Sequence, residues 1–217
     1  MSAAKTPPRP VTRLMLVTPE LADIETFEPM LEAAVSAGDV AAVVIRLAPA
    51  DERTRLSRAK ALVQIVHAEG AAALLCGEDI EDIVGRSGAD GVHVATPGED
   101  IAEIVARFQP EKIVGCAPQS RDGAMSAGEA GCDYVLFGED FGGAPFPATL
   151  ERVEWWVPIF ETPCVAFAQT LEDVAPLAAL DAEFVALGEA LWRHEGGPAT
   201  AMAGVGATLS LVKAPTP

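Results

Sequence analysis

Short apolar runs recur along this chain. Four of them directly follow a similar short sequence segment that contains an acidic residue. The acidic residues are Asp39, Asp90, Asp133 and Glu183, so the intervals between them are 51, 43 and 50 residues. One strand with its helix takes about 25 residues in an α/β protein. Each interval therefore holds two strand-helix units, and the whole chain holds eight.

The apolar runs are continuous stretches of Val, Ile, Leu and Ala rather than alternating ones, which is typical of strands buried on both faces of a parallel sheet. They predict eight strands, at 13–18, 40–46, 71–76, 91–95, 112–116, 133–137, 163–167 and 183–187. Eight parallel strand-helix units close into a (β/α)₈ barrel, a TIM barrel, for which about 200 residues suffice. We therefore expect a single barrel domain over 13–212.

Residues at helical spacing, with capping residues at their ends, predict the intervening helices. These helices are expected at 23–37, 51–69, 81–87, 100–108, 121–130, 149–157 and 171–180, with a last helical stretch over 188–192 and 198–212. Asp23 and Gly38 are the expected caps of the first helix. Residues 1–12 and 213–217 are expected to be a disordered leader and tail.

The composition narrows the choice of partners and compartment. The chain carries 15 basic and 32 acidic residues, a net charge of −17. Nucleic acids and anionic membranes attract basic surfaces, so neither is an expected partner. No apolar run approaches the roughly 20 residues that span a bilayer. The four cysteines form no CxxC pair, which favours reduced, buried thiols in a cytoplasmic protein.

Chemistry in a barrel of this kind takes place where the strands end. Arg46 ends the second predicted strand, and seven carboxylates follow other strands: Glu78, Asp79, Glu99, Asp100, Glu139, Asp140 and Glu189. Carboxylates crowded at one rim repel one another unless a cation compensates their charge. Mg²⁺ is a candidate cation because it prefers oxygen ligands. Asp79 and Asp100, after neighbouring strands, are the candidate pair. The alternative is that each of these acids stabilises the start of the helix that follows it.

Three other residue types have a structural interpretation and a chemical one. His93 lies within a predicted strand and is expected to be a core histidine, although it is the one histidine that can point into the barrel. Cys76 and Cys116, near strand ends, are expected to be buried thiols rather than nucleophiles or metal ligands. The Trp155-Trp156 pair is expected to pack the outer layer, with contact to a second copy in a homo-oligomer as the alternative.

Several segments resemble the thiamine phosphate synthases and their thiazole tautomerase relatives. Residues 88–94 (GADGVHV), followed by 98–101 (GEDI), are similar to the GADGVHLGQEDL segment of that family. Residues 131–138 (GCDYVLFG) are similar to its GADYVGFGP segment, and 14–18 (LMLVT) to its opening LYLVTD strand. The likeness runs in the same order over about 13–192. The family's fold is a (β/α)₈ barrel.

The resemblance implies a transferase that joins hydroxymethylpyrimidine diphosphate to a thiazole phosphate with Mg²⁺. It places the two metal-binding aspartates on Asp79 and Asp100, and a pyrophosphate-binding arginine on Arg46. Positions matching other substrate-binding groups of the family are Glu78, Gln119, Glu139, Gln169 and Gly188.

Departures from the family pattern point to a divergent member with a weak or altered activity. A glutamine and a lysine of the family's second strand are Val44 and Ala48 here, and a serine at the last phosphate site is Glu189. Each lost charge-assisted contact removes about 1.5–3 kcal/mol of binding energy. Two alternatives follow: a non-catalytic barrel that binds a thiazole or pyrimidine or regulates another protein, and an enzyme acting on a different, non-phosphorylated, cationic substrate.

Overall fold

The computed structural model describes residues 12–96, 98, 100–138 and 143–212. Within them, eight parallel strands form a closed barrel in chain order, with β8 pairing back to β1. The strands are β1 (Arg13–Val17), β2 (Val40–Arg46), β3 (Ala72–Cys76), β4 (Gly91–Val94), β5 (Ile113–Cys116), β6 (Tyr134–Phe137), β7 (Cys164–Ala168) and β8 (Phe184–Leu187). The barrel expected from the sequence is confirmed, and each of the four acidic residues precedes an even-numbered strand.

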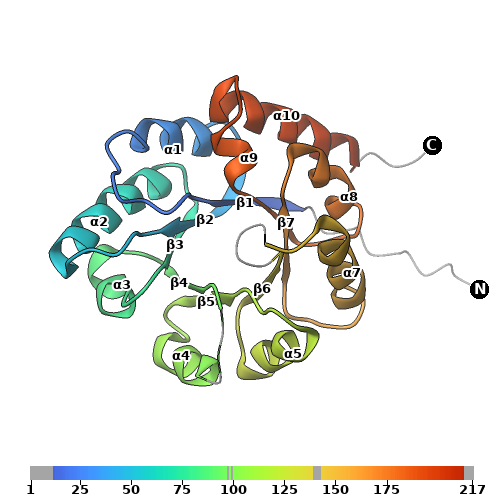
Figure 1. The fold of residues 1–217 in the computed structure, drawn as a ribbon, viewed down its shortest axis with the longest axis horizontal. Coiled ribbons are helices and arrows are strands. Elements are labelled where there is room, and N and C mark those ends of the chain that lie inside the picture. The colour runs from blue at the N-terminus through green and yellow to red at the C-terminus, as the bar shows by residue number, and fades with distance from the viewer. Residues whose placement is uncertain (1–11, 97, 99, 139–142, 213–217) are drawn as a thin grey trace, which may run out of the picture.

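Helices surround the strands as an outer ring (Figure 1). They are α1 (Glu28–Val35), α2 (Glu52–Ala68), α3 (Glu81–Ser87), α4 (Ile101–Phe108), α5 (Arg121–Ala130), α7 (Phe146–Trp156), the 3₁₀ turn η1 (Leu171–Asp173), α8 (Val174–Ala178), α9 (Glu189–Trp192) and α10 (Gly197–Val212). The short α9 lies inside this ring, over the end of the barrel near β1, as Figure 1 shows. No described helix combines the length and the apolar character needed to cross a bilayer.

Helix ends differ from the predicted ones where local polar groups or prolines decide the geometry. Asp23 does not cap the first helix, because its carboxylate accepts the N–H of Glu25 in a turn, and α1 begins at Glu28 with a proline in its first turn. Its C-cap is Ser36 rather than Gly38. α7 begins three residues before the predicted 149, again with proline in its first turn, where a missing N–H is harmless.

The chain enters the barrel one residue before the predicted start of the domain. Thr12 is buried, and its hydroxyl donates to the carbonyl of Ala182 at 2.8 Å. The segments 1–11 and 213–217 lie outside the described residues.

Two hydrophobic cores hold the layers together. The larger one fills the space between the strands and the helices. In it Trp156 is fully buried, stacks on Phe160 at 4.0 Å between ring centroids and donates its indole N–H to Thr162. This residue therefore packs the outer layer, as expected. The smaller core lies inside the barrel and contains Met15, Val44, Leu74, Leu136, Val165 and Ala186 among others.

A histidine-tyrosine pair lies in the centre of the barrel. His93 of β4 and Tyr134 of β6 are both buried, with 2.7 Å between His93 Nδ1 and the tyrosine hydroxyl. A Cβ on Gly115 would lie 1.9 Å from the Tyr134 ring, so only glycine leaves room for the tyrosine. His93 is thus a core histidine. Burial, aided by the nearby positive charge of Arg46, lowers its pKa to about 3, so the ring is neutral at physiological pH.

The four lead-in acids (Asp39, Asp90, Asp133 and Glu183) tie neighbouring strands together where the strands begin. The carboxylates of Asp90, Asp133 and Glu183 accept the backbone N–H groups of Ala73, Val114 and Cys164, at 2.7, 2.8 and 2.9 Å. The carboxylate of Asp39 instead pairs with the Arg13 side chain at 2.8 Å. In every case the partner belongs to the preceding odd-numbered strand, so the recurring phrase in the sequence has a structural role.

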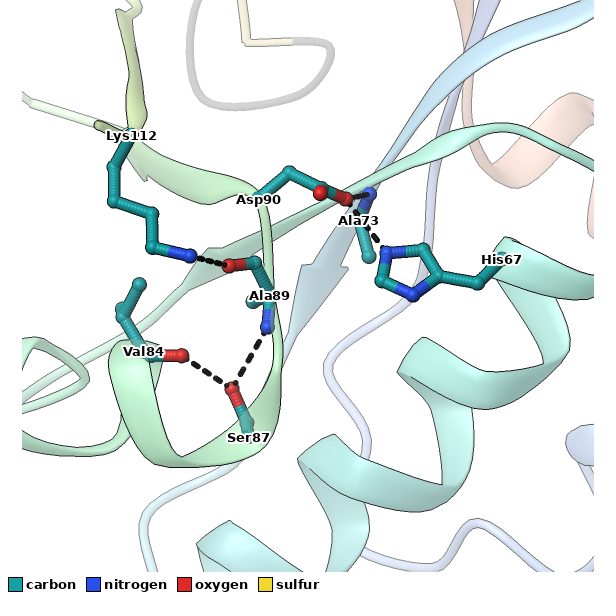
Figure 2. A network of polar contacts seen from close by, with 7 residues as sticks. All are labelled: His67, Ala73, Val84, Ser87, Ala89, Asp90 and Lys112. Carbon is teal, nitrogen blue, oxygen red and sulfur yellow. Dashed lines mark hydrogen bonds and ion pairs between the residues drawn. The ribbon is translucent and has the colours of Figure 1, made fainter. Parts of the chain in front are cut away.

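Figure 2 shows this arrangement around Asp90, whose carboxylate also lies 2.7 Å from His67 Nε2 on α2. Nearby, Lys112 donates to the Ala89 carbonyl at 2.6 Å. The hydroxyl of Ser87 donates to Val84 and accepts from the N–H of Ala89. The start of β4 is therefore linked by polar contacts to β3, to α2 and to the end of α3.

The first prediction concerns the lead-in acids. Replacing Asp133 by Ala leaves the part-buried Val114 N–H without its acceptor, which costs about 1–3 kcal/mol in the free energy of unfolding. Asp133→Asn keeps one acceptor oxygen and costs less. Urea denaturation measures both, with Glu154→Ala, on the exposed face of α7, as a control expected within about 0.5 kcal/mol of the parent. Equal stability of the Asp133→Ala and Glu154→Ala proteins would contradict the assigned role.

The second prediction concerns His93. Its folded pKa lies below the ordinary 6.5, so below about pH 6.5 the unfolded chain takes up a proton that the folded protein does not. The contribution of this residue to stability therefore falls with falling pH, by up to about 1.4 kcal/mol per unit, until the pH reaches its folded pKa. Urea unfolding of the parent and His93→Gln at pH 7, 6 and 5 measures this as a shrinking difference. A difference independent of pH, or an NMR titration of the folded ring near pH 6.5, refutes it.

Candidate functional site at the carboxyl ends of the strands

A cavity of about 430 Å³ opens at the carboxyl ends of β1, β2, β7 and β8. Its polar lining includes Thr18, Glu20, Arg46, Glu189 and Arg193. Its apolar lining includes Val17, Phe27, Met30, Phe167 and Trp192. This is the end of the barrel at which (β/α)₈ proteins bind ligands. The cavity therefore offers an aromatic interior and two arginines at the expected place.

Arg46 is held at the cavity by both of its backbone groups. Its N–H donates to the hydroxyl of the buried Thr18 at 2.9 Å, and its carbonyl accepts from Leu21 at 2.9 Å. The same loop after β1 is joined to β2 by a bridge between Leu21 and Leu47. The half-buried side chain of Arg46 also lowers the pKa of His93, which indicates that its positive charge acts toward the barrel interior.

Trp192 fixes a second part of the cavity wall. Its indole N–H donates to the carbonyl of Val17 at 2.7 Å, across 175 positions of sequence. Its ring meets that of Phe27 edge to face, with 4.8 Å between centroids. The adjacent Leu191 is fully buried. The short helix α9 is therefore attached firmly to β1 and to the segment before α1.

Two oppositely charged side chains project from this wall. Glu189 and Arg193 form an ion pair at 2.5 Å, one turn apart, and both are largely exposed, at 67% and 79%. From the sequence alone, Glu189 was expected to repel an anion. In the structure the positive charge of Arg193 lies beside that carboxylate, so the rim after β8 repels an anion less than expected.

Gly188 and Phe167 form the floor between the two walls. A Cβ at Gly188 would lie 2.8 Å from the Phe167 ring, so the absence of a side chain lets the ring lie under the cavity. Phe167 itself is 3% exposed. The floor is thus closed by an aromatic ring, and Gly188 is where the sequence analysis placed part of the binding site.

Asp79 and Asp100 follow β3 and β4, which are hydrogen-bonded neighbours. Both are exposed, and neither carboxylate accepts a hydrogen bond from the described residues. Asp79 also has a left-handed backbone, with φ of 48°, a conformation that costs energy in most residues and is found at functional sites. The capping interpretation is not supported by side-chain hydrogen bonds, although Asp100 occupies the N-cap position of α4.

The donor set at Asp79 and Asp100 suits Mg²⁺, which takes one or two carboxylates and completes its shell with water and substrate oxygens. Within 12–96, 98, 100–138 and 143–212, three or more His, Cys, Asp or Glu side chains do not gather into a metal-binding group. A closed all-protein metal cage is therefore not found in this part of the chain.

The other predicted binding residues, like Asp79 and Asp100, lie outside the cavity lining. Glu78 is exposed, and its backbone carbonyl accepts from the Arg55 side chain. Gln119 is exposed, and its backbone carbonyl accepts from Arg152 at 3.1 Å. The amide of Gln169 donates to the carbonyl of Ala144, so this side chain supports the loop before α7. Glu139, with Glu99 and Asp140, lies outside the described residues.

The thiol of Cys76, at the end of β3, is not activated. Burial raises its pKa to about 11, and the nearby charge of Arg46 offsets this only in part. A thiol with this pKa carries almost no thiolate at neutral pH, so it is a poor nucleophile. Cys116 is buried as well, with its sulfur 3.7 Å from that of Cys132.

Sequence motifs indicated little of the cavity wall. Thr18 ends the 14–18 segment that resembles the family's opening strand, but Phe27, Trp192 and Arg193, which also line the cavity, belong to no such motif. Trp192 and Arg193 lie five and six residues after the last strand, near the end of the barrel where sites form. Their orientation toward β1, however, depends on a contact between the two ends of the chain.

Comparison with known proteins agrees with this geometry. The sequence model of a family described as thiamine monophosphate synthase matches residues 14–191. The chain is 40% identical over 197 residues to a thiamine-phosphate synthase of Rhodospirillum centenum, covering 88% of this chain and 94% of that protein. It is 36% identical over 206 residues to one of Hyphomonas neptunium, with coverages of 90% and 92%.

Among solved structures, the thiamine phosphate pyrophosphorylase of Pyrococcus furiosus superposes with a TM-score of 0.78, covering 94% of this chain and 98% of that one. Because the two sequences are only 21% identical, this likeness shows the fold alone. The match of the family model over most of the chain, with the two relatives, identifies the chain as a member of the thiamine monophosphate synthase family.

Proposed function

We propose that this chain is a thiamine phosphate synthase, which joins hydroxymethylpyrimidine diphosphate to thiazole phosphate and releases pyrophosphate. The observation that carries the proposal is the cavity at the carboxyl ends of the strands, lined by Arg46 and Arg193, in a chain of this family. In the reaction, the bond between the pyrimidine methylene carbon and the diphosphate oxygen breaks with both electrons leaving on pyrophosphate. The thiazole nitrogen then donates its lone pair to that carbon.

Arg46 is the residue proposed to bind the departing pyrophosphate. A guanidinium offers several N–H donors in a planar fork, which suits phosphate oxygens, and it remains charged at any physiological pH. Because both backbone groups of Arg46 are hydrogen-bonded, the backbone that carries the guanidinium is fixed before the substrate arrives. A positioned positive charge assists most when negative charge accumulates on the leaving group.

The apolar wall has a protective role in this chemistry. A carbocation on the pyrimidine methylene reacts with any water that reaches it, which gives an alcohol instead of the coupled product. Phe27, Phe167 and Trp192 contribute apolar aromatic surface to the cavity, and this surface offers water no hydrogen-bond partner. The thiazole nitrogen needs no base to become nucleophilic, which agrees with the neutral His93 and the protonated Cys76.

Mg²⁺, when bound, supplies positive charge that stabilises the pyrophosphate as it leaves. Asp79 and Asp100 are the residues that would hold it. Their exposed carboxylates, which follow neighbouring strands, support this assignment.

A second candidate function is a barrel that binds thiazole or pyrimidine compounds without turning them over. It is favoured by Glu20 and Glu189, two carboxylates in a cavity that would receive phosphorylated substrates. Thermal unfolding distinguishes the two, since a ligand raises the unfolding temperature only of a protein that binds it. Stabilisation by pyrophosphate with Mg²⁺ supports the synthase, whereas stabilisation by the thiazole alcohol but not its phosphate supports the binder.

The third prediction tests the activity itself. Pure protein with Mg²⁺ and both substrates is expected to form thiamine phosphate, which chromatography measures. Asp79→Asn and Asp100→Asn each remove a metal-binding charge, so we expect kcat/KM to fall about 10-fold to 100-fold or more, and excess chelator to abolish turnover. Asp122→Asn, an exposed change on α5, serves as the control with unchanged activity. No product at concentrations that saturate an active relative would exclude the proposal.

The fourth prediction concerns Arg46. Arg46→Gln removes a charge-assisted contact worth about 1.5–3 kcal/mol, so kcat/KM is expected to fall by about 10-fold to 100-fold. Arg46→Lys keeps the positive charge but lacks the planar fork of donors, so its kcat/KM should fall less. Steady-state kinetics with the pyrimidine diphosphate varied gives both values, and Arg53→Gln, exposed at the start of α2, is the matched control. Activity equal to that of the control would rule out contact with pyrophosphate.

A further inference from the structure

We propose that Arg193 binds the phosphate group of the thiazole substrate and selects the phosphorylated thiazole over the alcohol. The inference rests on the proposed function and goes beyond it, because it assigns the second anion of the reaction to a residue that no motif of the sequence indicated. Three observations carry it: the anchoring of Arg193, its exchangeable partner Glu189, and the entry of the two arginines into the cavity from different elements.

The first observation is the anchoring of Arg193. The residue directly before it, Trp192, is buried, and its indole N–H is hydrogen-bonded to Val17 on β1. The N–H of Arg193 donates to the carbonyl of Glu189 at 2.9 Å. Its backbone is therefore fixed beside the cavity, while its side chain is 79% exposed and can turn toward a ligand. A residue with a fixed backbone and an exposed side-chain end suits a ligand that enters from solvent.

The second observation is the ion pair between Arg193 and Glu189. An exposed pair one helical turn apart is weak, because water screens both charges. A phosphate monoester carries more negative charge than one carboxylate and matches the guanidinium fork with two oxygens. The incoming phosphate can therefore replace Glu189 as the partner of Arg193. Until then, Glu189 orients the guanidinium and lowers the affinity for anions that bind without the thiazole ring.

The third observation is the arrangement of charges around the aromatic floor. Arg46 enters the cavity from the end of β2, and Arg193 from the segment after β8. The rings of Phe27, Phe167 and Trp192 lie among the cavity-lining residues, where a flat heteroaromatic ring is bound by apolar contact. Two anionic substrates that react with each other need separate cations. One arginine from each of these two elements meets this need, with Arg46 for the diphosphate and Arg193 for the monoester.

Kinetics of paired variants tests the assignment. Arg193→Gln is expected to raise KM for thiazole phosphate about 10-fold to 100-fold, in line with the loss of one charge-assisted contact, with KM for the pyrimidine diphosphate changed less than about 3-fold. Arg193→Lys should recover part of the loss, and Glu189→Gln should lower KM for thiazole phosphate. Arg86→Gln, which also breaks an exposed arginine-glutamate pair but away from the cavity, is the matched control.

Direct binding separates a failure of this inference from a failure of the proposed function. Calorimetric titration with thiazole phosphate and with the thiazole alcohol needs no turnover. Preference for the phosphate in the parent, lost in Arg193→Gln while alcohol binding stays the same, supports the inference even if no thiamine phosphate forms. It is overturned if Arg193→Gln keeps the preference, if it weakens ester and alcohol equally, or if the parent shows no preference.

Discussion

The carboxylate that precedes each even-numbered strand holds the barrel together at the end where the strands begin. In a parallel sheet, the first N–H groups of a strand have no partner from a hairpin, and buried N–H groups without acceptors are costly. Asp90, Asp133 and Glu183 supply the acceptors for three odd-numbered strands, and Asp39 binds the side chain that begins β1. These contacts join the strands in pairs at this end, and the opposite end of the barrel is left to the loops, which can carry chemistry.

The strands were predicted to within about a residue of their observed bounds, because the same acidic phrase and the same continuous apolar run mark several of them. The helix ends were predicted less well. Asp23 has the residue type of an N-cap, yet its carboxylate binds the N–H of Glu25 and the helix starts five residues later, at Glu28. Both choices satisfy a backbone donor locally, and only the packing of Phe27 on Trp192 distinguishes them.

The candidate site was predicted in part, for a related reason. Arg46 and Gly188 end strands, so their position at the rim follows from the barrel alone. Glu189 also follows a strand, but its partner Arg193 and the anchoring Trp192 gain their meaning from contacts with the first strand and the segment after it. Sequence spacing contains no information about such contacts. The left-handed backbone of Asp79 could likewise not be predicted from the sequence, since aspartate adopts this conformation at some positions and not at others.

The hydrogen bond between Trp192 and Val17 joins residues 175 positions apart, and this has a consequence during synthesis. A chain emerging from the ribosome has its first strands, including Arg46, outside the exit tunnel long before residue 192 is made. The wall formed by α9 is added last, so the chain cannot enclose a ligand until nearly all of it has been translated. A message truncated before this point yields a product without the wall.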